Sequence, residues 1–103
     1  MREVTRNTNI AVGTDSVTLS EAVSPNAVRT AIVITNTSTA GQYLTVNFGD
    51  GDAVATYGIV LAPYGSWAET EDARFTPSQA RISIISSAAL GTVAVHERQR
   101  IMG

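Results

Sequence analysis

The stretch from Arg29 to Phe48, RTAIVITNTSTAGQYLTVNF, decides the expected fold. Its first part, RTAIVITN, places apolar side chains at successive positions, so both faces of a strand formed there are apolar and the strand should lie deep. After a polar break over residues 36–41, the second part alternates, with Leu44, Val46 and Phe48 on one face and polar side chains on the other. That alternation is typical of a half-buried strand. The two segments therefore predict two central strands of a small β-sandwich.

The composition favours a sheet over a helix. The chain has 103 residues and a hydrophobic content of 44%, which is enough for one core and one domain. It contains 13 threonines, 11 valines and 8 isoleucines against only 4 leucines. Because β-branched side chains pack well on a strand and lose rotamer freedom in a helix, an all-β domain is expected.

About eight short apolar segments separated by turn signals predict an antiparallel β-sandwich or jelly roll. The expected organisation is a polar N-terminal arm over residues 1–9, a β-sandwich domain over residues 10–98 and a C-terminal tail over residues 99–103. The expected core consists of Val17, Leu19, Ile32, Ile34, Leu44, Val46, Phe48, Ile59, Leu61, Trp67, Ile82, Ile84, Val93 and Val95.

Several functional classes are disfavoured by what the sequence lacks. It contains no cysteine, so neither a disulfide nor a thiolate nucleophile is available. All seven basic residues are arginines, the net charge is −2 and no basic run occurs, which argues against a nucleic-acid partner. No apolar run approaches the roughly 20 residues of a membrane helix, and the N-terminus lacks the apolar segment of a secretory signal. We therefore expect neither a membrane nor a nucleic acid as partner.

The sequence offers few groups for catalysis. His96 is the only histidine, and neighbouring strand residues point to opposite faces, so His96 and Glu97 should diverge and leave His96 as a polar surface position. Glu69 and Glu71 should share one strand face, as a carboxylate pair in a glycosidase might, but a charged edge strand that discourages unwanted pairing is the favoured interpretation. We predict no catalytic residue, no cofactor and no enzymatic activity.

Two further groups allow a binding interpretation. Asp50 and Asp52 resemble part of a calcium loop, but the remaining ligand spacing is absent, so a plain turn and no metal site are expected. Pro63 and Gly65 predict a tight turn in which Gly65 supplies the positive φ and Tyr64 is exposed at the tip. An exposed tyrosine at a loop tip could contact a sugar or a partner protein.

From residue 29 onward, the order of motifs resembles that of small β-sandwich structural proteins of tailed phages and related viruses. The matching segments are RTAIVITN, YLTVNFG, GIVLAPYGSW, ARISIIS and TVAVHE, which span about 70 of the 103 residues. This chain has Tyr64-Gly65 where that pattern commonly has two glycines. The resemblance implies a capsid decoration or minor capsid protein, made in the host cytoplasm, located on the capsid surface of the virion and often trimeric. The implied partner is the major capsid protein or a neighbouring virion protein.

The two polar ends and the Tyr64 turn are the expected contact surfaces. The N-terminal residues cannot contribute to a core, and the C-terminal segment ends in two apolar residues that suit docking onto a neighbour, unless the last strand simply continues. The predicted partner-binding residues are Arg2, Thr5, Arg6, Asn7, Tyr64, Arg98, Arg100, Ile101 and Met102. The alternatives left open are a carbohydrate- or receptor-binding module of a virus tail or fibre and, with least support, a hydrolase that uses Glu69 and Glu71.

Overall fold

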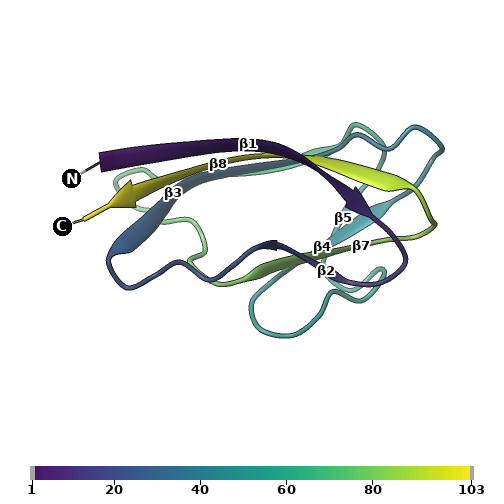
Figure 1. Ribbon diagram of the computed structural model, residues 1–103, viewed down its shortest axis with the longest axis horizontal. Helices are drawn as coiled ribbons and strands as arrows, with labels where there is room; N and C mark the ends of the chain where they lie inside the picture. Colours follow the sequence, from purple (N-terminus) through teal and green to yellow (C-terminus); the bar gives the residue numbers. More distant parts are fainter. Residues whose placement is uncertain (1, 103) are drawn as a thin grey trace.

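The computed structural model describes residues 2–102, which form two four-stranded antiparallel sheets packed face to face (Figure 1). Met1 and Gly103, the outermost residues of the expected arm and tail, lie outside the described residues. No helix occurs in the described range. The strands are β1 (Arg2–Val12), β2 (Val17–Ser20), β3 (Ala27–Asn36), β4 (Leu44–Phe48), β5 (Ile59–Leu61), β6 (Ser66–Thr70), β7 (Ile82–Ser86) and β8 (Gly91–Ile101).

The strand order is that of a jelly roll. One sheet has the order β1-β8-β3-β6 and the other has the order β2-β7-β4-β5. The first strand pairs with the eighth, the second with the seventh, the third with the sixth and the fourth with the fifth. The chain is thus one long antiparallel ribbon rolled into two layers, which is the defining feature of this architecture. The predicted all-β sandwich of eight strands is confirmed.

The two segments that predicted the fold occupy interior strands of different sheets. β3 lies between β8 and β6, whereas β4 lies between β7 and β5. At the end of β3, the fully buried Asn36 connects the two layers. Its Nδ2 donates to the carbonyl oxygens of Gln42 at 2.8 Å and Leu61 at 2.9 Å, and its Oδ1 accepts from the Ser38 amide at 3.0 Å. The polar break after β3 is therefore an ordered crossing between the sheets.

The core lies between the sheets and largely contains the predicted side chains. Its fully buried members come from both layers: Val12, Leu19, Ile32, Ile34, Leu44, Val46, Leu61, Ile82, Ile84, Val93 and Val95. Val17, Phe48 and Ile59 pack against this cluster and are partly buried. Val12 belongs to the core although it was not predicted there.

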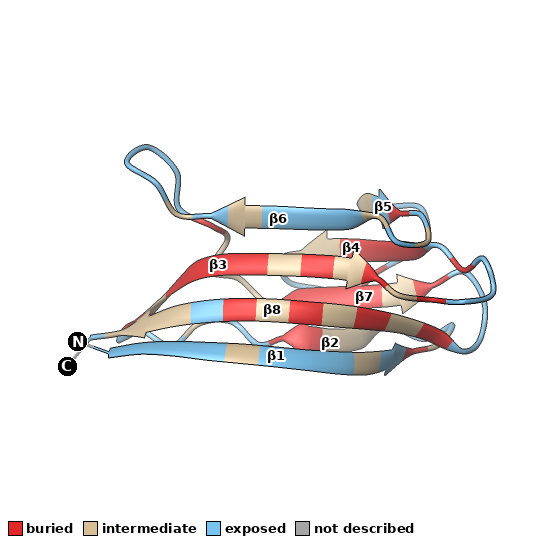
Figure 2. Cartoon of the chain, turned by 90° about the horizontal axis from the view of Figure 1, so that it is seen from above, coloured by how far each residue is buried: buried red, intermediate tan, exposed pale blue. Residues whose placement is uncertain are grey.

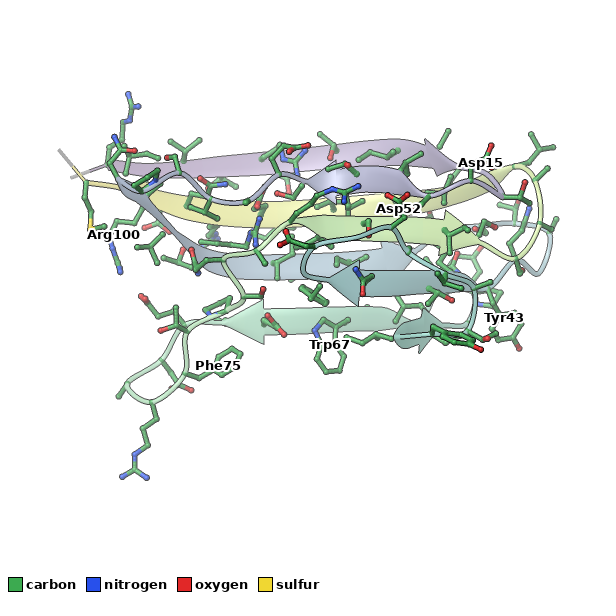
Figure 3. All side chains as sticks on the ribbon, turned by 90° about the horizontal axis from the view of Figure 1, so that it is seen from below. Asp15, Tyr43, Asp52, Trp67, Phe75 and Arg100 are labelled. Atoms are coloured by element: carbon green, nitrogen blue, oxygen red, sulfur yellow. The ribbon has the colours of Figure 1, made fainter. Side chains whose placement is uncertain are left out.

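The prediction that Trp67 is a core residue was wrong. Trp67 is 38% exposed, because β6 is the outermost strand of its sheet (Figure 3). Its Nε1 donates to Oε2 of Glu69 at 3.2 Å, so the indole has a polar partner outside the core.

The turn between β5 and β6 forms where it was expected, but with a different residue in the left-handed conformation. The amide of Gly65 donates to the carbonyl oxygen of Ala62 at 2.8 Å, which closes a four-residue turn. Tyr64, with a φ of 64°, takes the positive angle that had been expected of Gly65. Pro63 precedes it at the position where its fixed φ suits a type II turn, and that turn type places the positive φ on the residue after the proline.

The chain ends are strands. Residues 2–9 belong to β1 rather than to a separate arm, and β8 continues through Ile101. β1 and β8 pair along their whole length, from Arg2 opposite Ile101 to Val12 opposite Gly91. The molecule is elongated, with extents of 42 × 24 × 23 Å, and both ends of the chain lie at one tip (Figure 1). At this tip, β1, β8 and β3 extend beyond the second sheet (Figure 2).

Candidate functional site

The extension of one sheet beyond the other leaves an inward-facing surface uncovered at the terminal tip. Because side chains alternate along a strand, the even-numbered residues of β1 and the odd-numbered residues of β8 face this side. They line a shallow groove of about 230 Å³, which we call the terminal groove; its lining residues are Arg2, Val4, Arg6, Glu97, Gln99 and Ile101.

Glu97 closes the inner end of the terminal groove. It is only 4% exposed and accepts hydrogen bonds from four side chains, those of Arg6, Ser20, Arg29 and Gln99. Nε of Arg29 lies 2.7 Å from its Oε2, Oγ of Ser20 lies 2.8 Å from the same oxygen, and Nη2 of Arg6 lies 3.0 Å from its Oε1. One carboxylate therefore connects β1, β2, β3 and β8.

Arg29 is fully buried, yet each of its three guanidinium nitrogens has an acceptor. Nε donates to Glu97 at 2.7 Å. Nη1 donates to the carbonyl oxygens of Ser78 at 2.6 Å and Ala80 at 3.0 Å. Nη2 donates to Oγ of Ser20 at 2.9 Å and to the carbonyl oxygen of Glu21 at 3.0 Å. A guanidinium group carries five N–H donors, and these five bonds use all of them. The charge can be buried because its polar groups are fully satisfied.

The environment of Glu97 keeps its carboxylate charged. Burial raises the pKa of Glu97, but the hydrogen bonds from Arg29 and Ser20 and the charges of Arg29 and Arg6 outweigh that effect and lower it below 4.5. At neutral pH one negative charge is thus shared between two arginines. Together with Arg2, these groups give the terminal groove a net positive charge.

The opposite, outward-facing side of the tip carries a second ion pair. Nη1 and Nη2 of Arg100 donate to Oε1 and Oε2 of Glu71 at 3.0 and 3.1 Å, and this pairing raises the pKa of Arg100. Further along the same face, Nδ1 of His96 lies 2.7 Å from Oδ1 of Asn7. The outer face of the tip therefore presents paired polar groups, whereas the groove also presents the apolar side chains of Val4 and Ile101.

The structure brings most of the predicted contact residues to one tip but distributes them over two faces. Arg2, Arg6 and Ile101 line the terminal groove. The outward-facing set consists of Thr5, Asn7, Arg98 and Arg100. Met102 follows β8 and is 41% exposed.

Tyr64 lies at the far end of the molecule. Its amide donates to the carbonyl oxygen of Asn36, the last residue of β3, whereas the first residue of β3 pairs with Ile101 at the tip. Figure 3 places Tyr43, which immediately precedes β4, at this far end and Arg100 at the tip. Tyr64 and the predicted terminal residues therefore cannot form one site.

The groups considered for catalysis are engaged elsewhere. Glu69 accepts from Nε1 of Trp67 and from the Ser78 amide, whereas Glu71 binds Arg100. The expectation that the two glutamates share a strand face was wrong, because β6 ends at Thr70. As expected, His96 and Glu97 point to opposite faces of β8, with His96 on the outward-facing side. The burial of Glu97 was not predicted.

Asp52 pairs with Arg81 at 3.3 Å. Within residues 2–102, no group of three or more His, Asp or Glu side chains could hold a metal ion.

The buried pair of Arg29 and Glu97 was missed by sequence reasoning, although a signal was present. Glu97 follows Val93 and Val95 in the same strand at intervals of two residues, so its side chain points to the same face as theirs. It therefore occupies a core-facing position. Arg29, the third residue of β3, is out of phase in the sequence with the inward-facing Ile32 and Ile34, and it faces inward because the register with β8 shifts between Arg29 and Ala31. Alternation could therefore have indicated the position of Glu97 but not that of its partner.

No protein-family model matches the sequence, and no similar sequence was found among curated proteins. No helix that could span a membrane is present in the part of the chain that the structure describes. The fold and the terminal groove are thus the features from which a function can be argued.

Substitution of Glu97 by Gln should lower the free energy of unfolding by about 3–5 kcal/mol at pH 7, because it leaves the buried Arg29 without its counter-charge. The pKa of Glu97 is lower in the folded chain, so its contribution is present above about pH 4.5 and is lost as the pH falls below that value. Urea unfolding of both proteins between pH 7 and pH 3 measures this, and the variant should lack that part of the acid dependence.

The matched control is Glu71→Gln, which breaks the partly exposed pair with Arg100. It should cost much less stability, because solvent screens that pair. Equal losses in the two variants would contradict the importance assigned to Glu97.

Proposed function

We propose that this protein is a non-enzymatic structural component of a virion, a decoration or minor capsid protein that docks onto the capsid through its terminal groove. Two observations support the proposal. The strand order is that of the jelly roll, an architecture used by viral capsid domains as well as by lectins and cupins. The motif order from residue 29 onward resembles that of phage structural proteins. Because a fold alone does not determine a function, the groove carries the argument.

The single observation that carries the proposal is the uncovered inner face of the tip. Val4, at 43% exposure, and Ile101 line a groove that the second sheet does not reach, and Met102 lies just beyond it. Exposed apolar surface rimmed by polar groups marks interaction sites. Arg2 stands at the open end of the groove, whereas Arg6 is held by Glu97. The surface suits an extended segment of a shell protein that carries an apolar side chain next to an acidic one.

The proposed mechanism is binding without chemistry. A single contact on this tip is small, and isolated interfaces of this size are weak. A capsid repeats its docking sites on a lattice, so a protein that self-associates can engage several sites at once and be retained strongly. The homotrimer that the resemblance implies remains a prediction. Each docked copy would stabilise the shell by burying surface on a neighbouring subunit.

The test begins with purified particles of the parent virus. Quantitative mass spectrometry should find this chain at a fixed fraction of the major shell protein, because decoration follows the lattice. A few copies in each particle would instead indicate that the protein lies at a vertex, the portal or the tail. Absence from the particle would overturn the proposal.

Substitution of Ile101 by Asp should weaken binding of the purified protein to particles at least tenfold in a co-sedimentation assay, because it places a charge in the apolar part of the groove. The control is Val60→Asp, which introduces the same charge at a partly exposed valine of β5 in the other sheet. It should bind like the unmodified chain. Equal binding by both variants would contradict the claim that the protein docks through the terminal groove.

A second candidate function, recognition of a surface glycan, is supported by the opposite end. Tyr64 is 72% exposed and is held in a left-handed backbone conformation that bulky residues seldom adopt. Tyr43, also exposed, immediately precedes Leu44, and Leu44 pairs with Leu61 just before the Tyr64 turn. Exposed aromatic rings at one end of the molecule can stack against a sugar.

Substitution of Tyr64 by Ala distinguishes the two candidates on a glycan array. If the far end binds sugar, the unmodified chain should give a signal that the variant loses, because the stacking surface is gone. The capsid proposal expects no signal from either protein and unchanged binding of the variant to particles. A Tyr64→Phe control retains the ring and should keep any glycan signal.

A further inference from the structure

β1 is an outer strand of its sheet, and its free edge is the longest in the molecule. It spans eleven residues, pairs with β8 on one side in an uninterrupted register, and has no strand on its other side among residues 2–102. All but three of its residues are exposed. Such an edge offers a row of unpaired N–H and C=O groups that can accept a further strand.

The three other outer strands do not offer a comparable edge. β5 has three residues, β2 has four residues and an irregular register between Thr18 and Ser20, and β6 has five residues. Short edge strands and bulges are the usual protection against edge-to-edge association. β1 contains neither a bulge nor a proline, and its three charged residues, Arg2, Glu3 and Arg6, lie in its first half. The open edge is therefore specific to this strand.

The sequence of β1 is complementary to itself. In an antiparallel pair related by a two-fold axis, only an axis through Asn7 lets all eleven residues of one copy face all eleven of the other. This register places Arg2 opposite Val12, Glu3 opposite Ala11, Val4 opposite Ile10, Thr5 opposite Asn9, Arg6 opposite Thr8 and Asn7 opposite its own copy. The exposed Val4 of each copy thereby lies opposite Ile10 of the other copy. No like charges lie directly opposite each other in this register.

The neighbouring registers are less favourable. An axis through Arg6 would place two arginines opposite each other, which destabilises a sheet. In the Asn7-centred register the two Arg6 side chains are only diagonal neighbours, and each already lies 3.0 Å from Glu97 of its own chain. The charge pattern thus excludes the Arg6-centred register, and the Asn7-centred register pairs more backbone than the Thr8-centred one.

We propose that two copies of this chain associate through β1, centred on Asn7, and form a continuous eight-stranded sheet across a two-fold axis. The uncovered tip of each copy would then lie beside the two-layered body of the other, since residues 2–6 of one β1 face residues 8–12 of its partner. This inference depends on the edge strand alone and does not require the virion function. A two-fold dimer also differs in copy number from the trimer that the resemblance implies.

The first measurement is the mass in solution by sedimentation equilibrium, from micromolar to millimolar concentration. A species of twice the 10.8 kDa chain mass is expected. A monomer throughout this range, or a trimer, would overturn the proposal.

The register is tested with single cysteines, because the natural chain has none. Asn7→Cys should form a covalent dimer on oxidation, since directly opposite strand residues have Cα atoms about 4.5–5.5 Å apart, within the range of a disulfide. Thr5→Cys is the control: its two copies would be offset by four residues along the strands, about 13 Å, and should not cross-link. Cross-linking through Thr5, or a dimer in which neither variant cross-links, would overturn the proposed pairing.

A charge at the axis gives an independent check. Asn7→Lys places two ammonium groups opposite each other and should raise the dimer dissociation constant by up to about fivefold. Ala68→Lys adds the same charge to the exposed middle of β6 and should leave the constant unchanged. Ile101→Asp, which is separated from the free edge by β1, should also dimerise normally. Equal constants for the two lysine variants would count against a contact at Asn7.

Discussion

The structure depends on one interaction, the buried contact between Arg29 and Glu97. Most of the sandwich is held by aliphatic side chains between two sheets, but at the terminal tip one sheet continues alone. Arg29 and Glu97 lie at this transition. Their hydrogen bonds join three strands of the longer sheet to β2 and to the backbone before β7. A buried ion pair usually contributes little net stability compared with apolar packing, but its geometry is exacting. Here that geometry fixes where the two-layered body ends and the single layer begins.

The difference in length between the sheets creates the surfaces that can interact. β1 and β8 have eleven residues each, whereas no strand of the second sheet has more than five. The excess length has two effects. It exposes apolar side chains on the inner face of the tip, and it leaves a long backbone edge on β1. Both effects follow from extra residues at the two ends of the rolled ribbon, so one feature of the chain generates the groove and the edge together.

Much of the fold could be predicted from the sequence, because alternation and turn chemistry are local. The segments around Ile32, Leu44 and Ile84 were recognised as strands, and the core list was largely correct. Trp67 was misplaced because alternation gives the face of a strand and not its position within a sheet. The residues of the tip were identified as contact candidates from the polarity of the N-terminal segment and from the two apolar residues, Ile101 and Met102, that end the C-terminal segment. To predict that these residues separate onto two faces, and that Glu97 lies beneath them, one needs the register between β1 and β8. That register joins positions about ninety residues apart in the sequence.

That pairing of the first strand with the last also has a kinetic consequence. Contacts between distant parts of a chain form slowly, because closing a long loop costs entropy before the contact repays it. The hairpin of β4 and β5 can form early, whereas β1 and β8 must meet across almost the whole chain. The terminal groove consists only of residues from these two strands. We therefore expect the groove to form late in folding, so that a partner that binds there would select copies whose folding is complete.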